Sequence, residues 1–343
     1  MPSSPRLGGV RARHLPCVPR RHGGPQHRGG MRRLPRFPGD VRPGQDPFRV
    51  VREAAYPRTV MIPYFEQPVL PLGPVKIHAF GVLVAVSMLV GIRLALRRCK
   101  TLSLDPDLCA DLLFYLLIAA FVSAHLFAVL AYFPGEVAKN PLMLLKIWEN
   151  ISSFGGILGA LFGIWLFFRW KSPPLPAGTA WKYLDAIAFA FPFAWAIGRL
   201  GCVFAHDHPG TVTGFPLGVS LSTPEARAYI TYFYGAAGRL GELPEPGKLA
   251  GMAYHDLGWY EFLYTLLVIV PVFLSLDRKP RPTGFFPLAF LLLYLPVRFL
   301  LDFLRISDAR YGGLTFAQYA SIAGFAVVAY VLCRRNLQTG TRF

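Results

Sequence analysis

Seven separate stretches of apolar side chains, most of them close to twenty residues long, decide what this chain can fold into. A helix needs about 20 apolar residues to cross the roughly 30 Å of hydrocarbon in a bilayer. Lipid offers no hydrogen-bond partners, so the backbone groups of a crossing segment must bond to one another. The expected spans are 79–96, 111–133, 153–168, 184–204, 260–276, 284–303 and 317–333. We therefore predict an all-α membrane protein of about seven transmembrane helices, in which the third and fifth spans need flanking residues to complete the crossing.

Charge supports the same interpretation. Only 16% of the residues are charged, against about 25% in soluble domains. Basic residues follow the odd-numbered spans: Arg97, Arg98 and Lys100; Arg169, Lys171 and Lys182; Arg278, Lys279 and Arg281; Arg334, Arg335 and Arg342. An odd number of spans puts all four clusters on one side, and cytoplasmic loops carry such an excess. The pattern predicts a cytoplasmic C-terminus and an outer position for Met61.

Residues 1–60 differ from the rest in composition. They contain thirteen arginines and three acids, are rich in proline and glycine, and lack any apolar periodicity. Such a segment cannot bury a core and is expected to be disordered. We interpret it as a basic extension or as upstream sequence before a true start at Met61; a nucleic-acid-binding arm is the weaker alternative. The polytopic membrane domain is then 61–343, and we expect no nucleic-acid partner.

A long polar segment interrupts the spans. Residues 205–259 lie between the fourth and fifth spans and are rich in glycine, proline, histidine and tyrosine. The predicted topology puts this loop region on the outer side. Loops of this length in compact proteins are commonly functional.

Ionisable side chains inside the spans are the strongest functional signal. Arg199 lies near the outer end of the fourth span, and Arg298 and Asp302 lie in the sixth. A charge at helix-centre depth costs roughly 2.5–3.5 kcal/mol, so these groups should face a protein interior or a wet cavity. Arg298, Asp302 and Arg305 share one helix face. One interpretation is a structural Arg298–Asp302 ion pair. In the other interpretation, Arg199 and Arg298 outnumber Asp302, so the site has a net positive charge. Guanidinium groups match the oxygens of a lipid phosphate.

Glycines and cysteines allow two interpretations as well. Gly155, Gly156, Gly159 and Gly163 have the spacing that lets helices approach closely, but the pair Gly155–Gly156 also opens the backbone to a substrate headgroup. Cys202 is expected to be a small packing residue. The five cysteines have no metal-binding spacing, so neither a metal nor another cofactor is predicted.

Four motifs together resemble one family. They are SSFGG at 152–156, GRLGCVF at 198–204, His255 with Tyr260 and Glu261, and RFLLDFLR at 298–305. In order, spacing and membrane depth, the chain from about 61 to 335 resembles prolipoprotein diacylglyceryl transferase, a bacterial inner-membrane enzyme. The chain departs from the family pattern in four places. Phe154 replaces a histidine, Phe80 a tyrosine, Asp302 a glutamate, and Ala205-His206-Asp207 an Asn-Gly-Glu sequence.

The resemblance implies a reaction. The lipobox cysteine thiol of a prolipoprotein attacks the glyceryl carbon of phosphatidylglycerol, a thioether forms, and glycerol phosphate leaves. This is the first step of bacterial lipoprotein maturation. Phosphatidylglycerol, prolipoprotein signal peptides and membrane lipids are then the partners, and 205–259 is periplasmic.

Roles for the residues follow from the same resemblance. We expect Arg199 and Arg298 to stabilise the leaving phosphate, Asp302 to orient Arg298, and His206 or His208 to act as base. The predicted substrate-binding residues are Gly155, Gly156, Gly198, Arg199, Gly201, Asp207, His255, Tyr260, Glu261 and Arg305. Two alternatives stay open. The missing histidine at position 154 supports a non-catalytic lipid-binding paralogue, and a small-molecule or ion transporter, with less support, would use Arg199, Arg298 and Asp302 as a relay.

Overall fold

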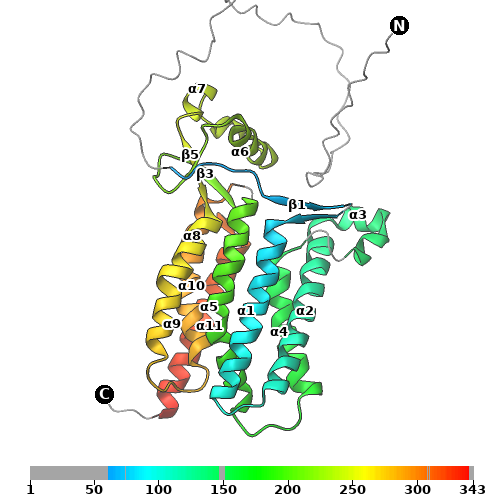
Figure 1. Cartoon of the computed structure of the whole chain (residues 1–343), viewed down its shortest axis with the longest axis vertical. Coiled ribbons are helices and arrows are strands. Elements are labelled where there is room, and N and C mark those ends of the chain that lie inside the picture. The colour runs from blue at the N-terminus through cyan, green and yellow to red at the C-terminus, as the bar shows by residue number, and fades with distance from the viewer. Residues whose placement is uncertain (1–60, 74, 147–150, 307, 309, 340–343) are drawn as a thin grey trace, which may run out of the picture. The chain divides into compact units, whose positions relative to one another are not determined.

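The computed structural model describes residues 61–339 except 74, 147–150, 307 and 309 (Figure 1). The predictions for 1–60 and for a start at Met61 concern a segment outside the described residues and stay predictions.

Within the described part, seven helices are long and apolar enough to cross a membrane, which confirms the predicted fold class. They are α1 (Ala79–Thr101), α2 (Pro106–Tyr132), α4 (Ser153–Leu166) with η3 (Phe167–Lys171), α5 (Thr179–Ala205), α8 (Leu257–Tyr264) with η5 (Thr265–Ile269) and α9 (Val270–Leu276), α10 (Phe285–Leu301) with η6 (Asp302–Leu304), and α11 (Phe316–Thr339). The third and fifth spans, predicted short, each gain length from a π-helical segment, η3 and η5 respectively.

Polar side chains fix where several helices begin. Asp105 accepts the backbone N–H of Asp107 ahead of Pro106 at the start of α2, and Asp256 accepts that of Trp259 at the start of α8. These bonds satisfy donors that a helix start leaves unpaired. Asp185, inside α5, does the same for another helix, because it accepts the N–H groups of Gly284 and Phe286 at the start of α10.

Small residues set the closest helix contacts. A Cβ atom on Gly159 would lie 2.4 Å from the carbonyl oxygen of Ala119, and one on Gly155 would lie 2.4 Å from the Cβ of Phe127. These glycines, with Gly163, therefore let α4 pack directly against α2. Gly198 and Gly201 face α1, and a Cβ atom on either would lie 3.4 Å or more from the nearest α1 atoms, which is ordinary van der Waals contact. The packing interpretation accounts for these glycines, and the headgroup role of Gly155 and Gly156 stays a prediction.

The segment predicted as a loop region is folded. An antiparallel sheet in the order β3–β5–β4 forms from β3 (Pro209–Thr213), β4 (Val219–Ser220) and β5 (Ala253–Asp256), with α6 (Pro224–Ala236), η4 (Leu240–Glu242) and α7 (Pro246–Leu249) beside it. Its core is formed by Leu221, Ile230 and Tyr254, all fully buried. Short strands between glycines and prolines give almost no periodicity, which is why the sequence did not predict them. We call residues 209–256 the head.

The remaining elements lie beside the ends of the spans. They are the hairpin of β1 (Val69–Leu72) and β2 (Val75–His78), the short helices α3 (Pro134–Lys139) and η2 (Pro141–Leu145), and the hairpin of β6 (Arg310–Tyr311) and β7 (Leu314–Thr315). The start of the described chain joins the head, since Ile62 pairs with Val219 and its N–H donates to the carbonyl of Gly218.

The spans alternate in direction, so α5 ends and α8 begins at the head while α1, η3, α9 and α11 end at the opposite side (Figure 1). The basic clusters after the odd-numbered spans therefore share the side away from the head, apart from Arg342, which lies outside the described residues. One member, Arg98 near the end of α1, pairs with Asp277, which directly follows α9.

Candidate active site

A single buried carboxylate joins two arginines from different spans. Glu261, in the first turns of α8, places Oε2 2.7 Å from Nη2 of Arg199 on α5 and Oε1 2.6 Å from Nη1 of Arg298 on α10. The hydroxyl of Tyr294, one turn before Arg298, donates to the same carboxylate at 2.7 Å. Glu261 is only 1% exposed and Arg199 only 8%. The predicted arginines therefore converge, and they do so through an acid that was predicted only as a substrate ligand.

The fold explains why these groups meet. The Asp256 cap starts α8 directly after β5, so Glu261 enters the bundle about one turn below the head. Arg199 lies about two turns before the end of α5, at the same side of the bundle. Its guanidinium carbon also lies 4.4 Å from the centre of the Trp195 ring, a cation–π contact on the preceding turn.

Asp302 is the centre of a second ion group. It is fully buried, with Oδ1 3.1 Å from both Nη2 of Arg298 and Nε of Arg305. The hydroxyl of Thr315 donates to its other oxygen, which ties the end of α10 to the start of α11. Arg305 also binds Asp308 at 3.0 Å. The predicted Arg298–Asp302 pair is present, as one contact of a larger network.

This network corrects the expected charge of the site. Counting two arginines against one acid gave a net positive region. With Arg305 included, three arginines face three acids, Glu261, Asp302 and Asp308. The two-to-one count was wrong because it omitted two acids. Glu261 lies on another span, which helix spacing alone cannot bring to Arg199, and Asp308 lies three residues after Arg305. Balanced pairing lowers the cost of burying each charge.

Arg199 nevertheless keeps a free donor. Its Nη1 and Nη2 groups are directed at His208, Cys202, Tyr294 and Glu261, but Nε is buried and lacks a hydrogen-bond partner among the described residues. A buried N–H without a partner costs about 1–3 kcal/mol, so this donor is the kind of group that a bound oxyanion would satisfy.

The two candidate bases differ sharply in their surroundings. His206 is 3% exposed; its Nδ1 lies 3.1 Å from Oδ2 of Asp256 and its Nε2 3.0 Å from the carbonyl oxygen of Phe65. Its backbone is left-handed, with φ of +50°, where α5 ends. Burial raises the pKa of the adjoining Tyr254 and Tyr229 phenols, with Asp256 adding to the effect. Because it follows α5 directly and bonds to Asp256 at the end of β5, His206 holds the head against the spans.

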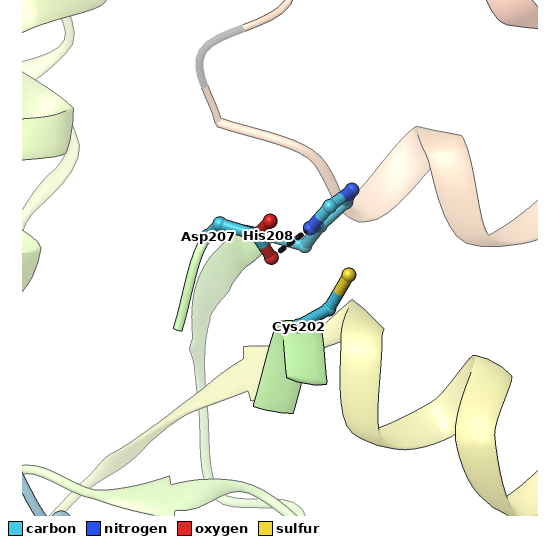
Figure 2. A group of neighbouring side chains, drawn as sticks. All are labelled: Cys202, Asp207 and His208. Atoms are coloured by element: carbon cyan, nitrogen blue, oxygen red, sulfur yellow. Dashed lines mark hydrogen bonds and ion pairs between the residues drawn. The ribbon is translucent and has the colours of Figure 1, made fainter. Parts of the chain in front are cut away.

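His208 instead contacts Arg199, and its ring lies beside the Asp207 carboxylate (Figure 2). Its Nδ1 contacts a carboxylate oxygen of Asp207, and its Nε2 lies 3.2 Å from Nη1 of Arg199. A guanidinium can only donate, so Nε2 accepts and the ring proton is on Nδ1, where it donates to Asp207. This assignment gives His208 the tautomer of a general base, oriented by an acid.

His255 and Tyr260 form a separate pair where the head meets α8. Nδ1 of His255 lies 2.8 Å from the Tyr260 hydroxyl, and Phe215 packs against both rings. Burial lowers the pKa of His255 below its usual value. Within the described residues, the hydrogen bond and ring contacts of this pair involve neither Glu261 nor the arginines.

Phe154, where the family pattern has histidine, is part of an aromatic cluster. Its ring centre is 5.1 Å from that of Phe127 and 4.4 Å from that of Phe316, both edge-on. The position is therefore apolar in this chain.

A cavity of about 540 Å³ lies beside Asp207 and is lined by Lys76, His78, Phe80 and Asp207 among others.

Four contributors were missed from the sequence: Tyr294, Thr315, Trp195 and Asp308. Tyr294 and Trp195 each lie four residues before one of the arginines, and this spacing puts them on the same helix face. Thr315 gave no such signal because its contact with Asp302 is made across two segments.

Comparisons with known proteins agree with these motifs. The profile of the family described as prolipoprotein diacylglyceryl transferase matches residues 67–334. A phosphatidylglycerol–prolipoprotein diacylglyceryl transferase of Trichormus variabilis is 30% identical over 76% of the chain and 86% of its own length. Proteins of the same name from Thermosynechococcus vestitus and Chromohalobacter salexigens are each 28% identical, over 81% and 74% of the chain and 96% and 84% of their own lengths. With its profile covering well over half of the sequence, the chain belongs to the prolipoprotein diacylglyceryl transferase family.

Proposed function

We propose that Arg199 and Arg298 bind the phosphate of phosphatidylglycerol while His208 activates the incoming thiol. The chain is a transferase that moves a diacylglyceryl group from phosphatidylglycerol to a prolipoprotein, the first step of lipoprotein maturation. The observation that carries the mechanism is the convergence of both arginines on Glu261, at 2.7 and 2.6 Å.

The arginine pair suits a leaving phosphate. Glu261 holds the two guanidinium groups from opposite sides, so they are positioned before any lipid arrives. Preorganised donors in a site shielded from water stabilise charge that develops in the transition state more strongly than solvent does. The unpartnered Nε of Arg199 supplies a donor that needs no bond to be broken first. Asp302 and Arg305 hold Arg298 from its other side.

His208 is assigned as the base because it contacts Arg199, the proposed phosphate ligand. A thiol reacts as the thiolate, and its usual pKa is about 8.5. Nε2 lies 3.2 Å from Nη1 of Arg199, so a thiol that displaces this hydrogen bond to reach Nε2 also lies beside the bound headgroup. Asp207 is then a positioning residue. His206, which is 3% exposed and bonded to Asp256 and to the backbone of Phe65 rather than to Arg199, is assigned a structural role.

The proposed step is a displacement at carbon. Nε2 of His208 takes the thiol proton, and the sulfur attacks the glyceryl carbon that is bonded to the phosphate oxygen. A carbon–sulfur bond forms, the carbon–oxygen bond breaks, and its electron pair goes to the phosphate. Glycerol phosphate leaves, and the proton on His208 passes to solvent.

The seven spans make the chain a multi-pass membrane protein. We infer that it lies in the bacterial inner membrane with its C-terminus in the cytoplasm and the head outside. The support is the basic side of the bundle, opposite the head, together with the excess of lysine and arginine typical of cytoplasmic loops. The signal peptide of the prolipoprotein is the proposed second substrate, and no nucleic acid is involved.

Reconstitution tests the mechanism. Purified protein in phosphatidylglycerol vesicles should convert a fluorescent lipobox peptide to its diacylglyceryl form. His208→Gln should lower kcat by about 10²–10⁴-fold, the usual contribution of a general base, with unfolding unchanged. Arg298→Gln should abolish turnover.

His206→Gln is the matched control on the same segment, and it should lower stability more than it lowers kcat in the protein that remains folded. Full activity of His208→Gln would refute the base assignment. An inactive wild-type chain that still binds lipid would instead favour the non-catalytic paralogue, and phosphatidylglycerol-independent ion flux would favour the transporter.

A further inference from the structure

Three potential metal ligands come together at the end of α5. The thiol of Cys202, a carboxylate oxygen of Asp207 and a ring nitrogen of His208 all lie within 4.8 Å of one another (Figure 2). The cysteine spacing gave no indication of this group, because Cys202 is helical while Asp207 and His208 follow the helix end. The left-handed backbone of His206 turns the chain back over α5 and brings the last two side chains to the thiol.

We propose that Cys202, Asp207 and His208 form an inhibitory site for a divalent cation of the zinc class. Thiolate sulfur, imidazole nitrogen and carboxylate oxygen are the three donor types that Zn²⁺ takes in proteins, and three protein ligands with an open fourth position are a common arrangement. Ligand atoms around a tetrahedral zinc lie roughly 3.5 Å apart, from bond lengths of about 2.0–2.3 Å. Rotation of exposed Asp207 and part-exposed His208 closes the remaining gap.

The charges around the cluster permit a cation. Arg199 is the nearest positive group, with Nη1 3.6 Å from the Cys202 sulfur. Its charge is opposed by Glu261 at 2.7 Å. Metal binding releases the thiol proton, so the thiolate and the Asp207 carboxylate together match the two charges of the ion.

Occupancy would block the proposed base. If zinc binds Nε2, the lone pair that takes the thiol proton is used. If zinc binds Nδ1, the ring proton of the neutral imidazole moves to Nε2, which then cannot accept. Both geometries remove the base and weaken the Arg199–His208 contact. This inhibition rests on the proposed function, whereas binding of the ion does not.

Binding is tested first, on the purified, metal-free full-length chain in detergent. Competition against a chromophoric chelator should find one tightly bound Zn²⁺ per chain. Cys202→Asn, Asp207→Asn and His208→Gln should each weaken it by about tenfold or more, since even outer-shell changes cost 10–100-fold. With Co²⁺ as a coloured substitute, a thiolate-to-cobalt absorption should appear and be absent in Cys202→Asn.

A double variant, Cys17→Ser with Cys333→Ser, is the matched control; Cys333 is exposed on α11, and neither cysteine belongs to the three-residue cluster. It should bind zinc as the wild type does. Unchanged binding in Cys202→Asn, or loss of binding in the control alone, overturns the site. Cys202→Ala provides a second test if Cys202→Asn folds poorly.

Inhibition is tested separately in the vesicle assay. Zn²⁺ should inhibit the wild type reversibly, with activity restored by a chelator, and Cys202→Asn should keep activity in its presence. If zinc binds at the three residues without inhibiting transfer, the regulatory role is refuted while the binding site itself is confirmed. A chain inactive in zinc-free buffer contradicts the proposed function, while the binding titration still decides whether the site exists.

Discussion

Replacing Glu261 with glutamine tests whether its carboxylate holds the site together, because the change removes a charge and little volume. Glu261 contacts Arg199 at 2.7 Å, Arg298 at 2.6 Å and the Tyr294 hydroxyl at 2.7 Å. Each charge pair, with centres about 4 Å apart, is worth roughly 4 kcal/mol at an effective dielectric constant of about 20. Much of this offsets desolvation, and deleting one partner of a buried pair costs about 3–5 kcal/mol.

We therefore expect Glu261→Gln to lose about 3–5 kcal/mol of unfolding free energy and all measurable transfer. The measurement is a denaturing-detergent titration followed by tryptophan fluorescence, with the vesicle assay run in parallel. Glu242→Gln is the matched control, since Glu242 pairs with Arg239 in an exposed contact and its loss should leave the titration unchanged.

A double variant separates charge balance from catalysis. Arg298 keeps Asp302 when Glu261 is neutralised, whereas Arg199 loses its acidic partner. Adding Arg199→Gln to Glu261→Gln removes that unbalanced charge, so stability should partly recover while activity stays absent. A loss of less than about 1 kcal/mol in Glu261→Gln, the range of an exposed pair, or no recovery in the double variant, would refute the reasoning.

Three further predictions concern other parts of the molecule. Asp207→Asn should lower kcat in the vesicle assay by about 10²-fold or more, because His208 loses the acceptor that fixes its tautomer; an unchanged kcat contradicts this. Gly159→Ala should destabilise the α2–α4 contact by about 1–3 kcal/mol in the same titration, since its Cβ would meet a carbonyl oxygen at 2.4 Å, whereas Gly135→Ala, with no atom within 4 Å, should not. Burial lowers the pKa of His255 in the folded protein. The neutral ring therefore contributes fully to stability above the unfolded pKa of about 6.5, and this contribution is lost as the pH falls toward the folded pKa. His255→Gln should reduce this acid sensitivity of the unfolding free energy, which amounts to at most about 1.4 kcal/mol per pH unit.

The number of spans, their order and the family motifs follow from the sequence alone. A membrane helix is specified locally, because each span must satisfy its own backbone and be apolar along its length. For the same reason Arg199, Arg298 and Asp302 could be identified as unusual without knowing what they touch. The head was missed, since strands of two to five residues are held by partners distant in sequence, as Val219 is by Tyr254 and Ile62.

Only the tertiary structure decided how the charges are paired and which histidine contacts Arg199. Glu261 and Arg199 are 62 positions apart and meet because two helices end and begin at the head. His206 and His208 are two residues apart and indistinguishable by composition. One turn of backbone buries the first against Asp256 and directs the second to Arg199. Contacts between separate segments are not encoded in local spacing, so the sequence could nominate these side chains but could not pair them.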